Sequence, residues 1–266
     1  MQHLPSKSLQ FFITAPHDCP YLDNRKERKL FVTLDSLNSN LLNNTLSKQG
    51  FRRSQNVLYR PSCTDCNACL SARIVTNNFM LSRSQKRVQK KNAMVCRIIL
   101  KPTVTKDHYI LFQRYVRTRH KAGGMSDMNF HEFSSMVEDS KVHTELIEYR
   151  DENSVLLGVC LTDILDDGVS MVYSFFDPKL KNNSFGTFMI LNHINYSKKL
   201  NLKYVYLGYW VNGSNKMQYK SSFSGLEVFA SQEWRPLTNA RINKNLNKPS
   251  NKDTTKKKIL EIKLSS

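Results

Sequence analysis

The sequence is short of acidic residues and contains no long apolar run. It has 22 Asp and Glu against 40 Lys and Arg, so its formal net charge is +18. This imbalance favours a polyanionic partner, either nucleic acid or an anionic membrane surface, although an AT-rich genome that enriches Lys and Asn would explain part of it. Because no apolar run is long enough to cross a bilayer and no signal-peptide pattern stands at the start, we expect a cytoplasmic protein.

The patterns of several well-known nucleotide and catalytic sites are also missing. The chain has no P-loop, no G-x-G-x-x-G turn and no readable Ser-His-Asp or Cys-His constellation. It lacks the zinc-finger, homeodomain and RNA-recognition signatures, which argues against a protein that reads DNA sequence. Contact with the phosphates of a structured RNA fits the charge better. With 266 residues and 40% hydrophobic content, the chain can form one large domain or two small ones.

The stretch over 169–210 carries the strongest architectural pattern. Val169–Phe176 is apolar and aromatic, as in a buried strand, and a helix with Ser184 as its N-cap follows. A second strand covers Tyr204–Leu207 and is broken at Gly208. A strand, a helix and a strand at this spacing predict a crossover unit with a parallel pair of strands. In such sheets ligands usually bind at the carboxyl ends of the strands, beside the helix N-terminus.

Hydrophobic periodicity predicts the remaining elements. We expect helices over 34–48, with Gly50 as C-cap, over 107–120 and over 129–137. Expected strands cover 29–33, 51–60, 70–75 and 95–102, and an antiparallel meander covers 143–176. The last 28 or so residues are basic with little core pattern, so we expect a mobile tail there.

Three cysteines follow one another at C-x2-C-x2-C spacing, and a tight loop of this kind turns several thiols toward one centre. They are Cys63, Cys66 and Cys69, with Cys19 as the candidate fourth ligand. Four thiolates suit zinc or an iron–sulfur cluster, whereas the alternative is a set of half-buried thiols that pack a loop. The surrounding arginines would favour thiolates. We expect Cys96 and Cys160, which lie in apolar strands, to belong to the core.

A strongly basic run and an aromatic cluster complete the candidate binding features. The cations of the run, Arg83, Lys86, Arg87, Lys90 and Lys91, fall mostly on one helical face. That face suits a nucleic-acid backbone, and the alternative is an ordinary solvated helix. The aromatic cluster near the end of the crossover contains Tyr206, Tyr209, Trp210 and Tyr219, with Lys216 and Lys220. It is either aromatic core or a pocket wall with cationic tips, and the Gly-containing loop favours the pocket.

Several short motifs occur together in a fixed order. They are Cys19-Pro20-Tyr21, Gly50-Phe51-Arg52-Arg53-Ser54, Tyr59-Arg60-Pro61, the cysteine run, Ser82-Arg83-Ser84-Gln85, Thr162-Asp163, Asp166-Asp167-Gly168, Tyr173-Ser174-Phe175-Phe176-Asp177-Pro178, Gly186-Thr187, Tyr206-Leu207-Gly208-Tyr209-Trp210, Lys216-Met217 and Tyr219-Lys220. In this combination the chain resembles the bacterial aspartate/glutamate leucyltransferases, relatives of the eukaryotic arginyl-tRNA–protein transferases. The resemblance runs from about Phe11 to Trp234.

This resemblance implies both a fold and a reaction. The fold class is α+β or α/β, with an acetyltransferase-like (GNAT-type) mixed sheet and crossover helix preceded by a smaller, cysteine-containing part. We therefore expect an N-terminal cysteine-containing region over 1–95, a GNAT-like aminoacyltransferase domain over 96–238 and the basic tail over 239–266. The implied reaction moves leucine from leucyl-tRNA to the α-amine of proteins that begin with Asp or Glu, which marks them for N-end rule degradation.

The reaction suggests roles for individual residues. An aminoacyl ester is already activated, so its aminolysis needs positioning, a base and oxyanion stabilisation, but no cofactor. Arg60 and Arg73, then Lys220, are our candidates to bind the acidic side chain, because Arg offers a bidentate fork for a carboxylate. The pocket residues Tyr206, Lys216 and Tyr219 would bind substrate, and the five cations of the basic run would bind tRNA. Asp163 or Asp166 would orient the α-ammonium and Tyr209 would hold the ester, although Asp166 has an alternative role as a turn residue.

Two other functions compete with this interpretation. One is an acyl-coenzyme A-dependent N-acyltransferase, which the crossover would suit but which usually needs a more Gly-rich turn before the helix. The other is a non-catalytic, metal-stabilised RNA-binding protein, which would have no need for the aromatic pocket.

Overall fold

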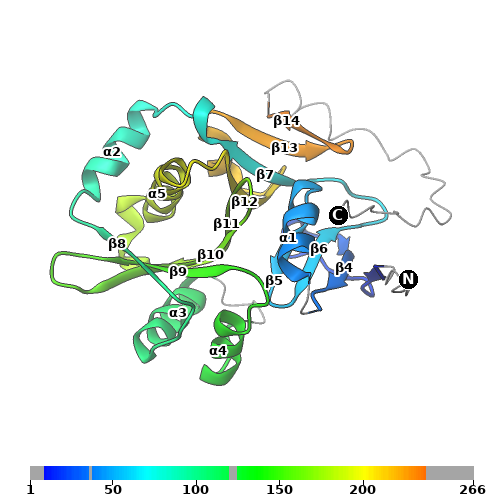
Figure 1. Cartoon of the computed structure of the whole chain (residues 1–266), viewed down its shortest axis with the longest axis horizontal. Coiled ribbons are helices and arrows are strands. Elements are labelled where there is room, and N and C mark those ends of the chain that lie inside the picture. The colour runs from blue at the N-terminus through cyan, green and yellow to red at the C-terminus, as the bar shows by residue number, and fades with distance from the viewer. Residues whose placement is uncertain (1–8, 36–37, 120–124, 238–266) are drawn as a thin grey trace, which may run out of the picture.

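The computed structural model describes residues 9–35, 38–119 and 125–237 (Figure 1). Its centre is an eight-stranded mixed sheet with the order β14-β13-β7-β12-β11-β10-β9-β8. Helices cover both faces of this sheet, and a smaller sheet with one helix lies beside it. The mixed sheet confirms the expected fold class. The expected basic tail lies outside the described residues.

The large sheet draws its strands from most of the chain. They are β7 (Cys69–Val75), β8 (Cys96–Leu100), β9 (Thr144–Arg150), β10 (Leu156–Ile164), β11 (Gly168–Phe176), β12 (Tyr204–Val211), β13 (Leu226–Ala230) and β14 (Glu233–Pro236). Strands β9, β10 and β11 pair antiparallel, as the expected meander requires. The short 3-10 helices are η1 (Thr76–Asn78), η2 (Pro178–Asn183) and η3 (Gln218–Ser222).

Helices pack on both faces of this sheet, and each face has its own apolar core. On one face lie α2 (Arg83–Lys91) and α5 (Phe185–Lys199), and on the other lie α3 (Lys106–Arg119) and α4 (Phe130–Glu138). Helix α5 buries apolar residues around most of its circumference, which is typical of a central helix rather than a surface one. Helix α2 then covers the outer side of α5, so α5 is enclosed by the sheet and a second helix.

The smaller sheet is formed by residues that precede β7. It has the order β1-β4-β6-β5, from β1 (Phe12–Ile13), β4 (Lys29–Thr33), β5 (Arg52–Ser54) and β6 (Val57–Pro61), and shares a core with α1 (Ser39–Lys48). A separate hairpin joins β2 (His17–Asp18) and β3 (Lys26–Glu27). The prediction of one strand over 51–60 is wrong, because Gln55 adopts a left-handed conformation (φ 49°) and turns the chain into the β5–β6 hairpin.

Helix α1 ends in a turn at Gly50, after which the chain runs toward the large sheet. Gly50 takes a φ of 80°, its N–H donates to the carbonyl of Ser47, and the N–H of Phe51 donates to that of Leu46. These two bonds form a Schellman motif, which satisfies the last carbonyls of the helix and confirms Gly50 as the stop residue. Strand β5 starts two residues later with Arg52.

The crossover unit β11–α5–β12 is present, with two corrections to its details. Strands β11 and β12 pair in parallel, as expected. Ser184 does not cap α5 with its side chain, and its backbone is left-handed (φ 51°) instead of extended as in most N-caps. Gly208 does not end the second strand, which continues to Val211. It follows instead a break in the strand register, and its φ is 74°.

Strand β7 links the two expected parts of the chain. It belongs to the cysteine-containing range 1–95, yet it pairs with β12 on one side and with β13 on the other. The amino-terminal part therefore contributes a central strand to the large sheet, and both parts share one hydrogen-bonded framework.

Candidate active site

Strands β11 and β12 separate soon after their pairing begins. Parallel pairing joins Gly168–Ser170 to Tyr204–Tyr206 and goes no further. Just past it, Val172 is an extra residue in the pairing of β11 with β10, and Leu207 is one in the pairing of β12 with β7. Such bulges bend a strand, so each strand turns away from the shared ladder. We use "the gap" for the place beyond Ser170 and Tyr206 where the two strands are no longer paired, at the edge where the sequence predicted a ligand.

The side chain of Arg52 occupies this gap. Its Nη2 donates to the carbonyls of Met171, at 3.2 Å, and Val172, at 3.0 Å, on β11. On the β12 side it lies so close to Gly208 that an added Cβ would stand 1.4 Å from Nη1. Gly208 therefore does two things: it adopts the positive φ of the bulge, and it leaves room for the guanidinium. The gap is filled at its base by a half-buried cation.

A second cation, Lys220, holds the same bulge. From η3, its Nζ donates to the carbonyls of Leu207, at 2.8 Å, and Tyr209, at 2.7 Å. The residue is only 5% exposed. Burial, helped by the charge of Arg52, lowers the pKa of Lys220 to about 7. Lys220 can thus lose its proton near neutral pH, which an exposed lysine does not.

Tyrosines surround the two cations. The Tyr209 hydroxyl donates to the carbonyl of Tyr59 at 2.9 Å, and the two ring centroids are 5.9 Å apart. Burial raises the pKa of Tyr21 and Tyr209, and the charge of Arg52 acts on both in the opposite direction. The Arg52 guanidinium acts electrostatically on Tyr21 of the cysteine-containing part, on Tyr209 of β12 and on Tyr219 of η3. These elements converge at the gap.

Arg60, on β6, is the cation whose surroundings best suit a substrate carboxylate. Its guanidinium lies 5.0 Å from the ring centroid of Phe51, and among the described residues it has no hydrogen bond or ion pair. Burial lowers its pKa, and Tyr209 lies close enough to act on it electrostatically in the opposite direction. A half-buried arginine without an anionic partner is costly, and an incoming carboxylate would relieve that cost.

Arg73 and Tyr206 lie elsewhere, beside the amino-terminal ends of β11 and β12. The Nε of Arg73 pairs with Glu227 at 2.9 Å, and its guanidinium carbon is 3.6 Å from the ring centroid of Tyr204 and 4.2 Å from that of Trp234. The Tyr206 hydroxyl donates to Asp167 at 3.0 Å. Arg73 therefore already has a carboxylate partner and an aromatic enclosure, unlike Arg60.

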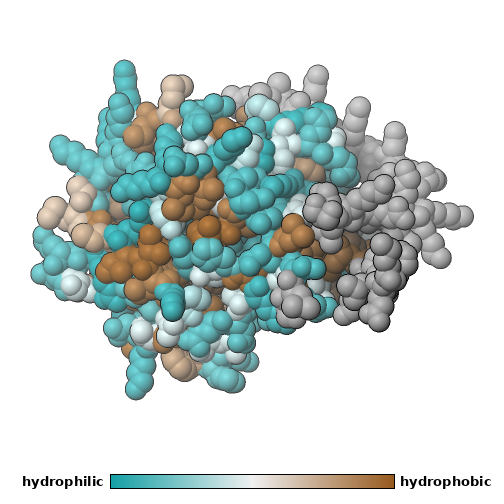
Figure 2. Space-filling view, viewed as in Figure 1, coloured by the Kyte–Doolittle hydropathy of each residue, from teal (hydrophilic) through white to brown (hydrophobic). Residues whose placement is uncertain are grey.

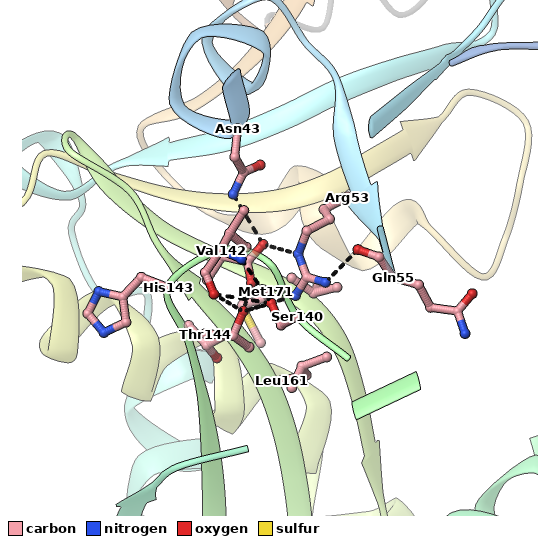
Figure 3. A network of polar contacts seen from close by, with 12 residues as sticks. Asn43, Arg53, Gln55, Ser140, Val142, His143, Thr144, Leu161 and Met171 are labelled. Carbon is pink, nitrogen blue, oxygen red and sulfur yellow. Dashed lines mark hydrogen bonds and ion pairs between the residues drawn. The ribbon is translucent and has the colours of Figure 1, made fainter. Parts of the chain in front are cut away.

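Asp163 lies in a buried polar network that joins the two parts of the chain, and Figure 3 labels its partners Asn43, Arg53 and Thr144. Its carboxylate receives two hydrogen bonds of 2.6 Å from Arg53, one of 2.8 Å from Thr144 and a longer one from Asn43. Both Arg53 and Asp163 have side chains that are only 1% exposed. By contrast, Asp166 is half exposed in the turn before β11 and pairs with Lys48 of α1 at 2.7 Å. These contacts favour structural roles for both aspartates.

The cysteines lie next to the tyrosine side of the gap. Burial raises the pKa of Cys63 and raises that of Cys69 to about 12, and the neighbouring thiols raise both further. For Cys63 and Cys69 the expectation that nearby arginines favour thiolates is therefore wrong, because burial is the largest influence on their pKa and no arginine side chain is among the groups that act on it. Among the residues that the structure describes, no group of three or more His, Cys, Asp or Glu is arranged to hold a metal ion. Cys160 is buried as expected, whereas Cys96 is exposed because β8 is the sheet edge.

The basic run forms the exposed helix that the sequence predicted. Helix α2 begins with a capping box between Ser82 and Gln85. Its five predicted tRNA-binding cations, Arg83, Lys86, Arg87, Lys90 and Lys91, are all exposed and none has an ion pair among the described residues. Figure 2 shows hydrophilic side chains over this part of the surface, whereas apolar side chains gather over β8, where Ile98, Ile99 and Leu100 are 39–40% exposed.

The structure thus brings together some predicted site residues and separates others. Tyr209, Lys220, the 43% exposed Tyr219 and the exposed Lys216 belong to β12 and the segment after it, and Arg60 faces them from β6. Sequence reasoning missed Arg52, although the Gly-Phe-Arg-Arg-Ser motif contains it. The sequence did contain a signal for Arg52. Adjacent arginines on a short strand after a helix stop must point in opposite directions, so Arg52 and Arg53 had to have different partners.

Two family models match this chain. The model described as "Arginine-tRNA-protein transferase, N terminus" matches residues 17–87, and the one described as "Arginine-tRNA-protein transferase, C terminus" matches residues 107–230. The chain belongs to the arginine-tRNA-protein transferase family. The resemblance drawn from the motifs is confirmed, and this transferase is an enzyme rather than a non-catalytic RNA-binding protein.

Curated relatives of this transferase carry the name "Aspartate/glutamate leucyltransferase". The protein of Dinoroseobacter shibae is 49% identical over 99% of this chain and 96% of its own length. That of Ruegeria pomeroyi is 50% identical over 99% and 97%, and that of a Jannaschia species is 54% identical over 89% and 84%. Among solved structures, L-PGS from Bacillus licheniformis overlaps with a TM-score of 0.42 at 9% identity, over 67% of this chain and 52% of that one.

No helix within the described parts of this transferase is both long and apolar enough to cross a membrane.

Proposed function

We propose that this transferase moves leucine from leucyl-tRNA onto the N-terminal α-amine of proteins that begin with Asp or Glu, which marks them for N-end rule degradation. The observation that carries the proposal is the identity of 49%, 50% and 54% to relatives with that name, over most of both chains. The partners would be leucyl-tRNA and proteins with an acidic first residue. We place the reaction in the cytoplasm, where tRNA is charged and used.

The gap between β11 and β12 is our candidate for the reacting centre. Aminolysis of the ester builds negative charge on the leucyl carbonyl oxygen, and a fixed cation in a site with little water stabilises that charge well. Arg52 is such a cation, because backbone carbonyls of β11 hold its guanidinium in place. The ring centroid of Tyr209 lies 5.7 Å from the guanidinium carbon of Arg52, and Tyr209 would hold the ester. The exposed Tyr219 and Lys216 would form the rim of the site.

Arg60 is our candidate for the residue that recognises Asp or Glu. It is within electrostatic reach of Tyr209 and has no carboxylate partner among the described residues. A bidentate bond from a half-buried guanidinium would favour a carboxylate over an amide or a methyl group. Arg73, Tyr206, Asp163 and Asp166 would then support the site indirectly, by holding the strands and the two parts of the chain together.

The exposed cations of α2 are our candidates for contact with the tRNA backbone. We also propose that the four cysteines, Cys19, Cys63, Cys66 and Cys69, can hold zinc or an iron–sulfur cluster. Their chemistry fits, since the charges of Cys19, Cys63 and Cys66 all act on Cys69. The raised pKa values of Cys63 and Cys69 mean that metal binding at these two thiols would release protons. Such a metal would stabilise the loop that carries Tyr21, and no step of the transfer needs it. Metal analysis of the purified protein tests this.

The proposed function is tested by mixing the purified protein with leucyl-tRNA and a peptide that begins with Asp. We expect a product heavier by one leucyl residue, with the leucine on the α-amine, as mass spectrometry of fragments would show. A matched peptide that begins with Asn should react far less. Absence of the product with both Asp and Glu peptides, from a sample that still binds leucyl-tRNA, would reject the function.

Arg60→Gln tests how the acidic residue is recognised. We expect KM for the Asp peptide to rise about 10- to 100-fold, because a charge-assisted hydrogen bond contributes roughly 1.5–3 kcal/mol, while leucyl-tRNA affinity stays unchanged. Arg25→Gln is the matched control, since Arg25 is exposed in the same part of the chain. An unchanged KM in the Arg60 variant would move recognition to another cation.

A further inference from the structure

Lys220 is a buried lysine whose only described partners are two backbone carbonyls. Nζ lies 2.8 Å from the Leu207 oxygen and 2.7 Å from the Tyr209 oxygen. No ion pair within the described part of the chain involves it. Buried lysines normally have a carboxylate partner, so the chemistry of this one needs an explanation.

The number of its hydrogen bonds fits a neutral amine. An ammonium has three N–H donors and no acceptor, and burial makes an unused donor costly. A neutral amine has two N–H donors and one lone pair. The two carbonyls match the two donors and leave the lone pair as an acceptor. The geometry therefore describes a base whose orientation is already fixed by the strand backbone.

The groups that face Lys220 agree with this protonation state. Arg52 approaches from β5 and is the charged group that acts on its pKa, which burial has already lowered to about 7. Within the described part of the chain, Tyr209 contacts Lys220 through its carbonyl and Tyr219 precedes it on η3, and both phenols have a raised pKa, so they stay neutral. None of these groups would stabilise an ammonium, and Arg52 opposes one.

We propose that Lys220 is the general base of the transfer and takes the proton from the α-ammonium of the acceptor protein. This inference rests on the proposed function and deepens it. Neither Asp163, whose carboxylate is bound by Arg53, nor the half-exposed Asp166 is needed for this step.

The proposed step conserves atoms and charge. The α-ammonium gives one proton to the Nζ lone pair, and the freed amine attacks the leucyl carbonyl carbon. A C–N bond forms, and the negative charge on the carbonyl oxygen faces Arg52. As the intermediate collapses, the C–O bond to the tRNA ribose breaks, and the second proton of the attacking nitrogen passes to the ribose oxygen. Lys220 then releases its proton to solvent, so one proton leaves per turnover.

The decisive experiment compares two acceptors in single-turnover reactions with leucyl-tRNA. One is an Asp-starting peptide, and the other is the same peptide with an aminooxy group in place of the α-amine. The aminooxy nitrogen is neutral at neutral pH and needs no base before it attacks. The variants are Lys220→Arg and Lys220→Met, and Lys203→Arg is the control, since Lys203 is exposed just before β12.

The two acceptors should respond differently. With the amine peptide we expect both Lys220 variants to lose about 100-fold or more in rate, the usual contribution of a general base. With the aminooxy peptide we expect a loss of less than about threefold, and the control should resemble the wild type with both. An equal loss with both acceptors would overturn the proposal, because a structural lysine would affect them alike.

The wild-type pH profile tests the same point even if the variants do not fold. With the amine peptide the rate should fall as pH drops, with a midpoint near 7, where Lys220 takes up its proton. A midpoint of ~8, where the free α-amine of the peptide is protonated, would overturn the assignment. With the aminooxy peptide the rate should stay level over that range. The same fall with both acceptors would overturn the assignment. A wild-type protein inactive with both peptides would instead reject the proposed function.

Discussion

Arg52 and Arg53 are neighbours with different surroundings, because successive side chains on a strand point in opposite directions. Arg53 points into the protein and binds Asp163, which ties β5 to β10. Arg52 points into the gap between β11 and β12. A shift of β5 by one residue would place Phe51 in the gap in one direction, or Ser54 beside Asp163 in the other, so one of the two positions would lose its arginine. The Arg53–Asp163 pair thus fixes the register that places Arg52.

Asp163→Asn should destabilise the fold strongly. It leaves Arg53 buried without its anionic partner, and breaking a buried pair costs roughly 3–5 kcal/mol. The matched change Asp166→Asn affects a half-exposed pair with Lys48, which is worth at most about 1 kcal/mol. Unfolding in urea would measure both free energies. Similar values for the two variants would show that the buried network does not hold the parts together.

Gly208→Ala should displace Arg52 from the gap. The new methyl group would stand 1.4 Å from Nη1 and would also force a φ of 74° on a non-glycine residue. We expect a loss of transfer rate of about 100-fold, as when an oxyanion donor is removed, with leucyl-tRNA still bound. The control is Gly186→Ala in α5, where the nearest atoms are at 3.5 Å and 3.8 Å on the Phe176 ring. Equal transfer rates in the two variants would remove Arg52 from the mechanism.

The choice between Arg60 and Arg73 could not be made from the sequence. Both are arginines that flank the cysteine run, and both were candidates for the same role. The difference comes from Glu227, which pairs with Arg73 across 154 positions of sequence through β13. Long-range pairing of this kind leaves no local pattern, so only the folded chain tells Arg73 from Arg60, which has no ion pair with any described residue.

Helix α2 was predictable because its pattern is local. The capping residues, the basic face and the polar flanks all lie within about a dozen positions, and the structure confirms the helix and the exposure of its cations. The crossover was predictable for the same reason. The gap beside it was not, because the bulges of β11 and β12 depend on their partners β10 and β7.

Charge reversal on α2 should weaken tRNA binding in a salt-dependent way. We expect the triple change of Lys86, Arg87 and Lys90 to Glu to lower affinity and to reduce the slope of log K against log salt by about one for each phosphate that is no longer neutralised. The control with equal charge change is Lys101, Lys106 and Lys141 to Glu, all exposed near α3 and α4. A salt slope that is the same in the two triple variants would move the tRNA-binding surface away from α2.

At the scale of the whole molecule, the two regions expected from the sequence are connected by more contacts than the motifs indicated. The motifs indicated two consecutive regions that meet near residue 95. In the structure the Arg53–Asp163 pair, the Lys48–Asp166 pair and β7 all cross between them. The candidate site is built from both, with Arg52 and Arg60 from the first region and Tyr209 and Lys220 from the second. Neither region holds a complete set.

The central position of β7 has a practical consequence for anyone who cuts this chain. A fragment that begins at residue 96 would lack the strand between β12 and β13, and would expose two rows of unsatisfied amide and carbonyl groups to self-association. A fragment that ends there would carry the missing strand with nothing to pair it. Neither half can therefore be expected to fold alone. In a hybrid enzyme made by exchanging halves between relatives, β7 from one relative would have to pair with β12 and β13 from the other.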